Sequence, residues 1–193
     1  MVADNPIGRF RKLFERARSL EGGDARSAAL ATADAEGRPS VRMIVLASID
    51  DDALVFCTSY ESRKARDLSQ NPRAALCLHW PSLSSQVRIE GLVTRASAAQ
   101  SDAHFGELSR GTQVSAWAAR QSEPLGSRSD LISTYRDVEA RWKARPIPRP
   151  ESWGAYLLAP ETIEFWHRYE NRLHDRLLYL RDGEGWRLER IAP

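Results

Sequence analysis

Hydrophobic residues recur along this chain with two different periods, and the changes of period delimit its expected elements. After Asn5 and Pro6, apolar side chains return every three or four positions, which is the spacing of an amphipathic helix. Asparagine is a common helix cap and proline favours the first helical turn, so both residues support a helix within residues 1–25. The pair Gly22-Gly23 is typical of its end.

Beyond this helix, most apolar residues stand in short runs that turn residues separate, a pattern typical of β-strands. We expect a helix at 62–68, a helical insertion at 98–145 with breaks near Gly111 and 124–126, and strands at 27–33, 40–48, 53–58, 73–80, 86–95, 153–158, 162–168, 176–181 and 186–190. The early strands follow one another with few helices between them, which favours an antiparallel sheet. The sequence therefore predicts a single domain over 1–193 of the α+β class, mainly β: an antiparallel β-barrel with flanking helices and C-terminal strands at 152–193.

The composition argues against several classes of protein, such as nucleic-acid-binding and membrane proteins, but does not identify a function. The chain has 193 residues, 42% hydrophobic and 28% charged, which is ordinary for a globular protein with its own core. Its formal net charge of +2 argues against nucleic acid or a membrane surface as partner. No apolar run approaches the ~20 residues of a membrane span, and the N-terminus does not read as a signal peptide. Cys57 and Cys77 lie in apolar runs, so we expect a reduced cytoplasmic protein, and no histidine or cysteine spacing suggests a metal site.

A helix start after the third expected strand is a candidate phosphate site. Thr58 ends the strand, and Ser62, Arg63 and Lys64 begin the helix. Free N–H groups at a helix N-terminus, joined by two cations, suit an anion. The alternative is a capped surface helix without a ligand.

A second candidate lies near the C-terminus, where Trp166 is followed by the segment 171–176. If that segment is extended, Arg172, His174 and Arg176 point to one face. Two guanidiniums and an imidazole together can bind an anionic or polar aromatic ligand. The alternative is a solvated basic strand edge.

Two further strands carry charge beside apolar residues. Arg42 opens an apolar run that extends to Leu46, and such a run can form the apolar wall of a ligand site or simply a core strand. Gln86 opens a strand on which Arg88 and Glu90 share one face, where they can pair with each other.

Taken in order, these segments resemble the pyridoxamine 5'-phosphate oxidase family, from the first helix to Pro193. The resemblance rests on S-R-K at 62–64, Q-V-R-I-E-G at 86–91, A-W-x-x-x-Q-S at 116–122, E-F-W at 164–166, R-L-H-D-R at 172–176 and the terminal R-I-A-P. It implies an FMN-binding split β-barrel and a homodimer with FMN at the subunit interface. It also implies an oxidase that passes a hydride from its substrate to the flavin, with O2 as acceptor and H2O2 as product.

The resemblance also implies roles for individual residues. The expected cofactor-binding residues are Arg42, Met43, Ile44, Val45, Leu46, Cys57, Thr58, Arg63, Lys64, Gln86, Gln121, Ser122, Trp166 and Arg176. Trp117 is expected to be structural. Arg172 would clamp a carboxylate or ring oxygen of the substrate, and His174 would hydrogen-bond or exchange a proton with it. These two are the expected catalytic residues, and His104, Arg110 and Thr112 are expected to join them in binding the substrate.

The chain departs from the family where the family binds its substrate's phosphate. Where the family has a Lys and an Arg, this chain has Ala47 and Leu108. Where the family has a Tyr and a Ser, it has His104 and Thr112. Arg110 is near enough in sequence to supply the cation that is missing at Leu108. Each lost charge-assisted bond is worth roughly 1.5–3 kcal/mol, so two losses weaken phosphate binding by on the order of a hundredfold or more. We therefore expect a small, non-phosphorylated heteroaromatic substrate of the phenazine-precursor type. Pyridoxine or pyridoxamine 5'-phosphate remains the alternative substrate, and a non-catalytic flavin-binding protein remains the alternative function.

Overall fold

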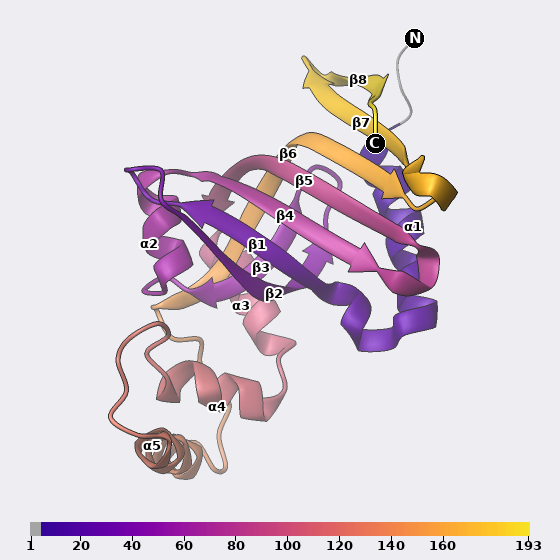
Figure 1. The fold of residues 1–193 in the computed structure, drawn as a ribbon. Helices are drawn as coiled ribbons and strands as arrows, with labels where there is room; N and C mark the ends of the chain where they lie inside the picture. Colours follow the sequence, from indigo (N-terminus) through magenta and orange to yellow (C-terminus); the bar gives the residue numbers. More distant parts are fainter. Residues whose placement is uncertain (1–4) are drawn as a thin grey trace.

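A closed antiparallel barrel forms the centre of the molecule. The computed structural model describes residues 5–193, and in it the strands follow the order β3-β2-β1-β4-β5-β6-β7-β8, with β3 also paired to β6 (Figure 1). This extra pairing closes β1 to β6 into a barrel, from which β7 and β8 extend along the outer edge of β6. The strands are β1 (Ser27–Ala33), β2 (Pro39–Ile49), β3 (Leu54–Ser59), β4 (Arg73–Trp80), β5 (Ser85–Arg95), β6 (Trp153–His167), β7 (Asp175–Asp182) and β8 (Gly185–Arg190). The expected mainly β, α+β architecture with flanking helices is confirmed.

The helices cover the barrel at two places. Figure 1 shows α1 beside one end of β4 and β5, whereas α3, α4 and α5 form a separate group beyond the opposite side. The α-helices are α1 (Pro6–Glu21), α2 (Arg63–Gln70), α3 (Ala98–Gly106), α4 (Arg110–Ala118) and α5 (Arg128–Arg141), and the 3-10 helices are η1 (Gly22–Arg26), η2 (Pro81–Leu83) and η3 (Glu170–Arg172). Asn5 caps α1 through its side chain, and Gly22 at φ 61° ends it, as the sequence predicts.

Aromatic packing fixes α1 and η1 against the barrel. The ring of Trp80, fully buried on β4, lies 6.1 Å from Phe10 and 6.2 Å from Phe14 of α1. The Trp80 indole Nε1 donates a hydrogen bond of 3.0 Å to the carbonyl oxygen of Ala25. Burial of such rings contributes on the order of 2 kcal/mol each, so this contact holds the short η1 helix, and Arg26 at its end, in a defined place.

A second, smaller core attaches the helical insertion to the barrel. Phe105 of α3 packs edge-on against Trp153, with ring centroids 5.2 Å apart, and Val114 and Ile147 are buried with them. The Trp117 indole donates a 2.8 Å bond to the carbonyl oxygen of Pro148 in the following linker. The structural role expected for Trp117 is consistent with this contact.

Two expected strands are one in the structure. β6 runs unbroken through Pro160, where the sequence predicts a gap between 158 and 162. The register with β5 shifts between Glu90 and Gly91, and a bulge of this kind tolerates a proline that cannot donate to the ladder. A Cβ on Gly91 would lie 1.9 Å from the carbonyl oxygen of Ala159, so this close approach requires glycine.

Two other local expectations can be compared with the structure. The break expected near Gly111 lies at 107–109, because the hydroxyl of Ser109 accepts a bond from the Thr112 amide and starts α4 there. The segment 171–176 is not extended, because Asn171 and Arg172 have φ values of 54° and 60° and form a tight turn before β7 begins at Asp175.

Candidate functional site

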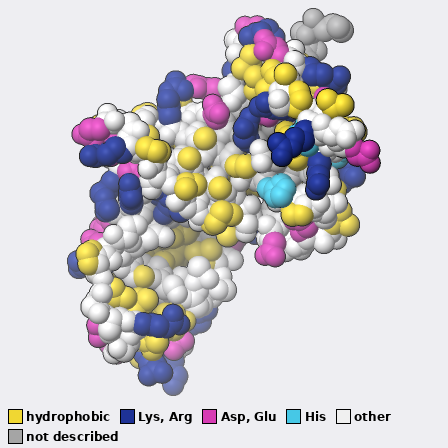
Figure 2. Space-filling model, in the orientation of Figure 1, with side chains coloured by type: hydrophobic (Ala, Val, Ile, Leu, Met, Phe, Trp, Pro, Cys, Tyr) yellow, Lys and Arg dark blue, Asp and Glu magenta, His cyan; other side chains and the backbone are white. Residues whose placement is uncertain are grey.

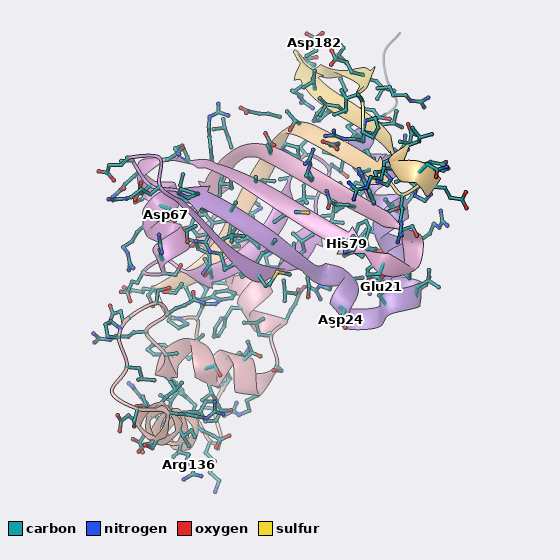
Figure 3. All side chains as sticks on the ribbon, in the orientation of Figure 1. Glu21, Asp24, Asp67, His79, Arg136 and Asp182 are labelled. Carbon is teal, nitrogen blue, oxygen red and sulfur yellow. The ribbon has the colours of Figure 1, made fainter. Side chains whose placement is uncertain are left out.

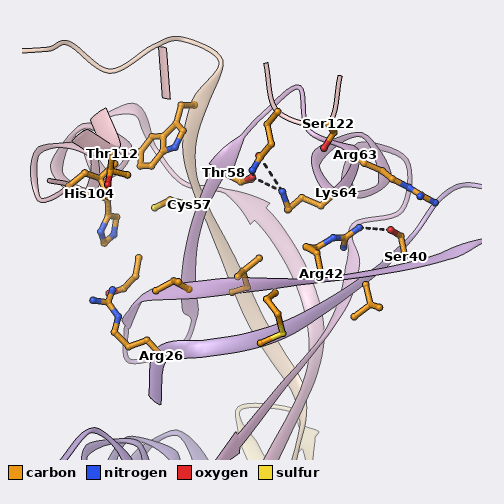
Figure 4. A pocket seen from close by; sticks show the side chains of 18 of the residues that line it. Arg26, Ser40, Arg42, Cys57, Thr58, Arg63, Lys64, His104, Thr112 and Ser122 are labelled. Atoms are coloured by element: carbon orange, nitrogen blue, oxygen red, sulfur yellow. Dashed lines mark hydrogen bonds between the residues drawn. The ribbon is translucent and has the colours of Figure 1, made fainter. Parts of the chain in front are cut away.

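A cavity of about 820 Å³ lies between the barrel and the helical insertion, lined from β2, β3, α2, α3 and α4. The space-filling view shows the surface hollowed in this region (Figure 2). Most of the expected cofactor and substrate residues line it: Arg42, Met43, Ile44, Val45, Cys57, Thr58, Arg63, Lys64, His104, Thr112, Gln121 and Ser122. Figure 4 shows that polar groups occupy both ends of the cavity, with Arg42, Arg63, Lys64 and Ser122 at one end and Arg26, His104 and Thr112 at the other.

The first end is built around a buried ammonium group. Lys64 is only 6% exposed, and its Nζ donates to Thr58 Oγ1 at 2.9 Å and to Gln121 Oε1 at 3.3 Å. Thr58 in turn donates to the same Gln121 oxygen at 2.7 Å. Burial lowers the pKa of Lys64 to about 8, and the charge of Arg42 adds to this effect. Within the described part of the chain this cation has only neutral partners, so the site can accommodate an anion.

The local sequence explains why Lys64 points inward. Ser62 precedes α2, and its hydroxyl donates a 2.8 Å bond to the carbonyl oxygen of Ser59 at the end of β3. The inner face of α2 then carries Lys64, Ala65, Asp67 and Leu68, all buried, at helical spacing. Arg63 lies on the exposed side of the same first turn and still borders the cavity.

Arg42 is held beside Lys64 by neighbours that the sequence did not reveal. Its guanidinium donates to Thr32 Oγ1 at 2.8 Å and to Ser40 Oγ at 2.7 Å, and lies 3.7 Å from a carboxylate oxygen of Asp67. Asp67 is buried and accepts a 2.6 Å bond from Thr32. Asp67 was not among the residues expected from the sequence, although helical spacing places it on the same face of α2 as Lys64 and Leu68.

The wall between the two ends is apolar and open to solvent. Three apolar side chains on the outer face of β2 are highly exposed: Val41 by 68%, Met43 by 65% and Val45 by 59%. Such exposure is unusual for three successive apolar residues on one face of a strand. Figure 2 shows hydrophobic side chains gathered on the face over β1 and β2. Leu46 does not belong to this wall: its side chain is buried in the barrel core, so the structure does not bring it into the cavity.

Arg26, which the sequence did not single out, lies at the second end. Its Nε donates to the carbonyl oxygen of Leu46 at 2.7 Å and its Nη2 to that of Ala47 at 3.0 Å. Burial raises the pKa of the Cys57 thiol to about 11; the charge of Glu107 raises it further, while that of Arg26 opposes the rise. Both charges therefore act at this end of the cavity. These contacts join residues about twenty positions apart, so no local pattern could have indicated them.

Arg110 does not reach the cavity. Its guanidinium bonds to the carbonyl oxygens of Trp142 and Arg145, just beyond α5. Carbonyl groups at a helix C-terminus lack partners within the helix and attract a cation. The expectation that Arg110 replaces the cation missing at Leu108 is therefore wrong.

A second cleft, away from the cavity, contains three of the other expected residues. Trp166, Arg172 and His174 border it together with His79. The rings of Trp166 and His174 lie 4.6 Å apart, and His174 Nδ1 accepts a 3.2 Å bond from the Tyr169 amide. Figure 3 marks the separation of the two sites, with Asp67 at one end of the sheet face and His79 at the other.

The pairing of charges in this region differs from expectation. Arg88 does not pair with Glu90 but forms an ion pair with Glu164 on the neighbouring strand β6. Arg176 bonds to the same carboxylate at 2.8 and 3.1 Å. Burial acts to raise the pKa of Glu164, but hydrogen bonds from Arg176 and Arg88 keep it below its ordinary value.

The other expected residues lie outside the cavity, partly because of the turn before β7. Arg172 and His174 do not share a strand face with Arg176, because they precede the strand. Gln86 is half-buried on β5, opposite Trp166 in the β5–β6 ladder. In one subunit, then, the structure separates Gln86, Trp166, Arg172, His174 and Arg176 from the cavity.

Comparisons with known proteins identify the family of this chain. Residues 16–142 match the family model described as pyridoxamine 5'-phosphate oxidase, and residues 153–193 match its C-terminal dimerisation region. The chain belongs to the pyridoxamine 5'-phosphate oxidase family. It is an oxidoreductase of that family, with the split barrel of its members.

Individual relatives cover the whole chain. The pyridoxine/pyridoxamine 5'-phosphate oxidase of Anaeromyxobacter dehalogenans is 53% identical over 192 residues, covering 100% of this chain and 97% of the relative. The enzyme of the same name from Myxococcus xanthus is 44% identical and covers 100% and 94%.

Two solved structures extend the comparison. PhzG from Burkholderia lata 383, solved with tetrahydrophenazine-1-carboxylic acid, is 31% identical, with a TM-score of 0.94 over 99% of this chain and 94% of that one. A pyridoxamine 5'-phosphate oxidase-related, FMN-binding protein from Nostoc punctiforme is 26% identical, with a TM-score of 0.75 over 96% of each chain.

Two kinds of feature are absent from residues 5–193. No cluster of three or more His, Cys, Asp or Glu side chains could hold a metal ion. None of the described helices is long and apolar enough to cross a membrane.

Proposed function

We propose that this protein is an FMN-dependent oxidase and that the buried Lys64 is the observation that carries the assignment. A lysine that is 6% exposed and bonded only to neutral groups within residues 5–193 is costly unless a ligand supplies the opposite charge. Arg42 and Arg63 border the same end of the cavity. Three cations beside the start of α2 fit the phosphate of FMN, and Thr58 and Gln121 would orient Lys64 toward it.

The rest of the cavity fits the other parts of that cofactor. The apolar side chains of Met43, Ile44 and Val45 would cover one side of its ring system, and Ser122 borders the cavity near the cationic end. Bound FMN would supply the redox chemistry, taking two electrons from the substrate and passing them to dioxygen, which becomes hydrogen peroxide. The protein's own groups would bind and orient the substrate and exclude water.

We further propose a homodimer in which two subunits complete each site. The match of residues 153–193 to a dimerisation region supports this assembly. Exposed Val41, Met43 and Val45 offer the apolar surface that a partner or a bound cofactor would cover. Arg172 and His174, remote from the cavity of their own subunit, would then act at the cavity of the other.

For the substrate, we propose a small heteroaromatic compound of the phenazine-precursor type that carries a carboxylate instead of a phosphate. Ala47 and Leu108 both border the cavity, so the positions where the family carries two cations face the expected substrate and are uncharged. The likeness to PhzG, whose structure contains tetrahydrophenazine-1-carboxylic acid, supports the same substrate class.

Pyridoxine or pyridoxamine 5'-phosphate is the second candidate. The 53% identity to an enzyme named for those substrates favours it. The changes Ala47→Lys and Leu108→Arg separate the two candidates. If phosphate binding has been lost, the double variant should bind pyridoxine 5'-phosphate more tightly, by up to about tenfold for each restored contact.

The test of the whole proposal is spectroscopic. The purified protein should carry about one FMN per subunit. Stopped-flow mixing without oxygen should then show the flavin band bleached by a dihydrophenazine carboxylate faster than by pyridoxine 5'-phosphate. A protein that takes up no added FMN would refute the cofactor. Flavin that neither substrate reduces would favour a non-catalytic binding protein, and faster reduction by pyridoxine 5'-phosphate would favour the second candidate.

A further inference from the structure

The end of the cavity opposite Lys64 contains the guanidinium of Arg26, and we propose that this group receives the acidic group of the substrate. The inference rests on the function proposed above, because it assigns the substrate to the end of the cavity that the cofactor phosphate does not need. The acidic group is a carboxylate or a phosphate, and the experiment below distinguishes them.

The backbone holds Arg26 in a defined orientation. η1 ends at this residue, and the bond from Trp80 to Ala25 fixes η1 one position earlier. The Nε and Nη2 groups of Arg26 donate to two successive carbonyl oxygens of β2, those of Leu46 and Ala47. Two such bonds on one edge fix the plane of the guanidinium before any ligand arrives, which lowers the entropy cost of binding.

The other edge of the guanidinium remains available. A guanidinium has more N–H donors than the two used here, and within residues 5–193 no further bond of Arg26 is found. The remaining donors on Nη1 and Nη2 lie parallel to each other, which is the arrangement that binds both oxygens of a carboxylate or phosphate. Since Arg26 borders the cavity, this edge can reach a ligand there.

The neighbours of Arg26 leave room for such a group. The side chain of Ala47, which borders the cavity beside Arg26, is only a methyl group. It takes up less of the cavity than a longer side chain would. Thr112 and His104 border the same end and can each add a hydrogen bond. Glu107 also borders it; its side chain is 77% exposed, and a carboxylate oxygen lies 3.7 Å from His104 Nδ1. A single guanidinium near a carboxylate favours an anion of low charge over a dianion.

A purely structural role for Arg26 makes a different prediction. If its only task is to attach η1 to β2, its loss should weaken the binding of charged and uncharged ligands alike. If it binds the acidic group, only ligands that carry one should lose affinity. Pairs of ligands that differ in that group alone therefore separate the two roles.

The experiment uses the FMN-loaded protein and follows the flavin spectrum as ligand is added. One pair is phenazine-1-carboxylate and phenazine-1-carboxamide, and the other is pyridoxal 5'-phosphate and pyridoxal. Arg26→Gln should raise the Kd of the anionic member of at least one pair by roughly 10- to 100-fold and leave its neutral partner within about twofold. Arg26→Lys should retain part of the preference, because it keeps the charge but not the paired donors. The pair that responds identifies the acidic group.

A second variant tests the charge without removing the bonds to β2. Ala47→Glu should place a carboxylate beside Arg26 and abolish the preference for the anionic ligand, whereas the matched Ala47→Gln should preserve most of it. If Arg26→Gln and Ala47→Glu change the Kd of the anionic and the neutral ligand of each pair equally, Arg26 does not bind the acidic group. That result would not affect the proposal that the protein binds FMN. Failure of the unaltered protein to bind FMN would overturn the proposed function and this inference together.

Discussion

Binding of FMN should weaken as the pH rises above about 8, because Lys64 loses its proton there when the site holds no phosphate. The pKa of Lys64 falls from 10.5 to about 8, through burial first and the charge of Arg42 second. A second phosphate ionisation near pH 6 keeps the ligand dianionic over the whole range of interest. The dianionic phosphate therefore binds best at neutral pH, where Lys64 is charged. In alkali Lys64 becomes neutral and binding weakens.

The size of the effect follows from that pKa. At pH 7 about nine in ten empty sites carry the charge, and at pH 9 about one in ten does, so the apparent Kd for FMN should rise about tenfold between the two. Riboflavin lacks the phosphate, so its Kd should change little.

Fluorescence titration of the apoprotein with each ligand, at several pH values from about 7 to about 9, measures both constants. Lys64→Arg, which keeps its charge, should remove the pH dependence without removing affinity. Lys64→Met should bind FMN weakly at every pH. If riboflavin and FMN show the same pH dependence in the unaltered protein, or if Lys64→Met binds FMN normally, then Lys64 does not contact the phosphate and the central argument for FMN fails.

Other consequences can be checked independently. Because the pKa of Lys64 is lower in the folded than in the unfolded chain, the folded apoprotein binds fewer protons between about pH 8 and 10.5, and its stability relative to Lys64→Met should rise over that window in urea titrations. Gly91→Ala should cost at least 1–3 kcal/mol in the same assay, since its methyl group would meet the Ala159 carbonyl, whereas Gly23→Ala, with open space around it, should cost little. Arg172→Ala and His174→Ala should leave FMN bound but slow its reduction by substrate in stopped-flow mixing; unchanged rates would show that the second cleft does not take part. Light scattering should find a dimer at micromolar concentration, and a flavin-loaded monomer would contradict the shared site.

Local sequence patterns were sufficient where neighbouring residues determine the structure. The strands Ser27–Ala33 and Arg73–Trp80 end where predicted, because turn residues flank both. Pro160 was misleading for a physical reason: proline usually interrupts a strand, but here it lies at a bulge that Gly91 accommodates from the opposite strand. Nothing near Pro160 in the sequence indicates that partner.

The candidate site shows the same division between local and distant information. The sequence motif identified Lys64 and Thr58, which are close in the chain, and the structure joins them by a hydrogen bond. The sequence did not indicate Arg26, because its contacts are with β2, twenty residues away. Arg172 and His174 were assigned to a strand face because alternation was the simplest reading, whereas left-handed backbone at Asn171 makes that segment a turn.

The long strand β6 has a consequence for how this chain can change in length. Trp153 at its start borders the cavity, and Trp166 near its end borders the second cleft. Inserting or deleting one residue between them would turn every side chain on one half of the strand to the opposite face. It would also change the spacing of the two sites by about 3.3 Å. Length variation among natural relatives should therefore avoid β6. It should concentrate between Ser122 and the start of α5, because Gln121 and Ser122 in the first part of the loop between α4 and α5 border the cavity.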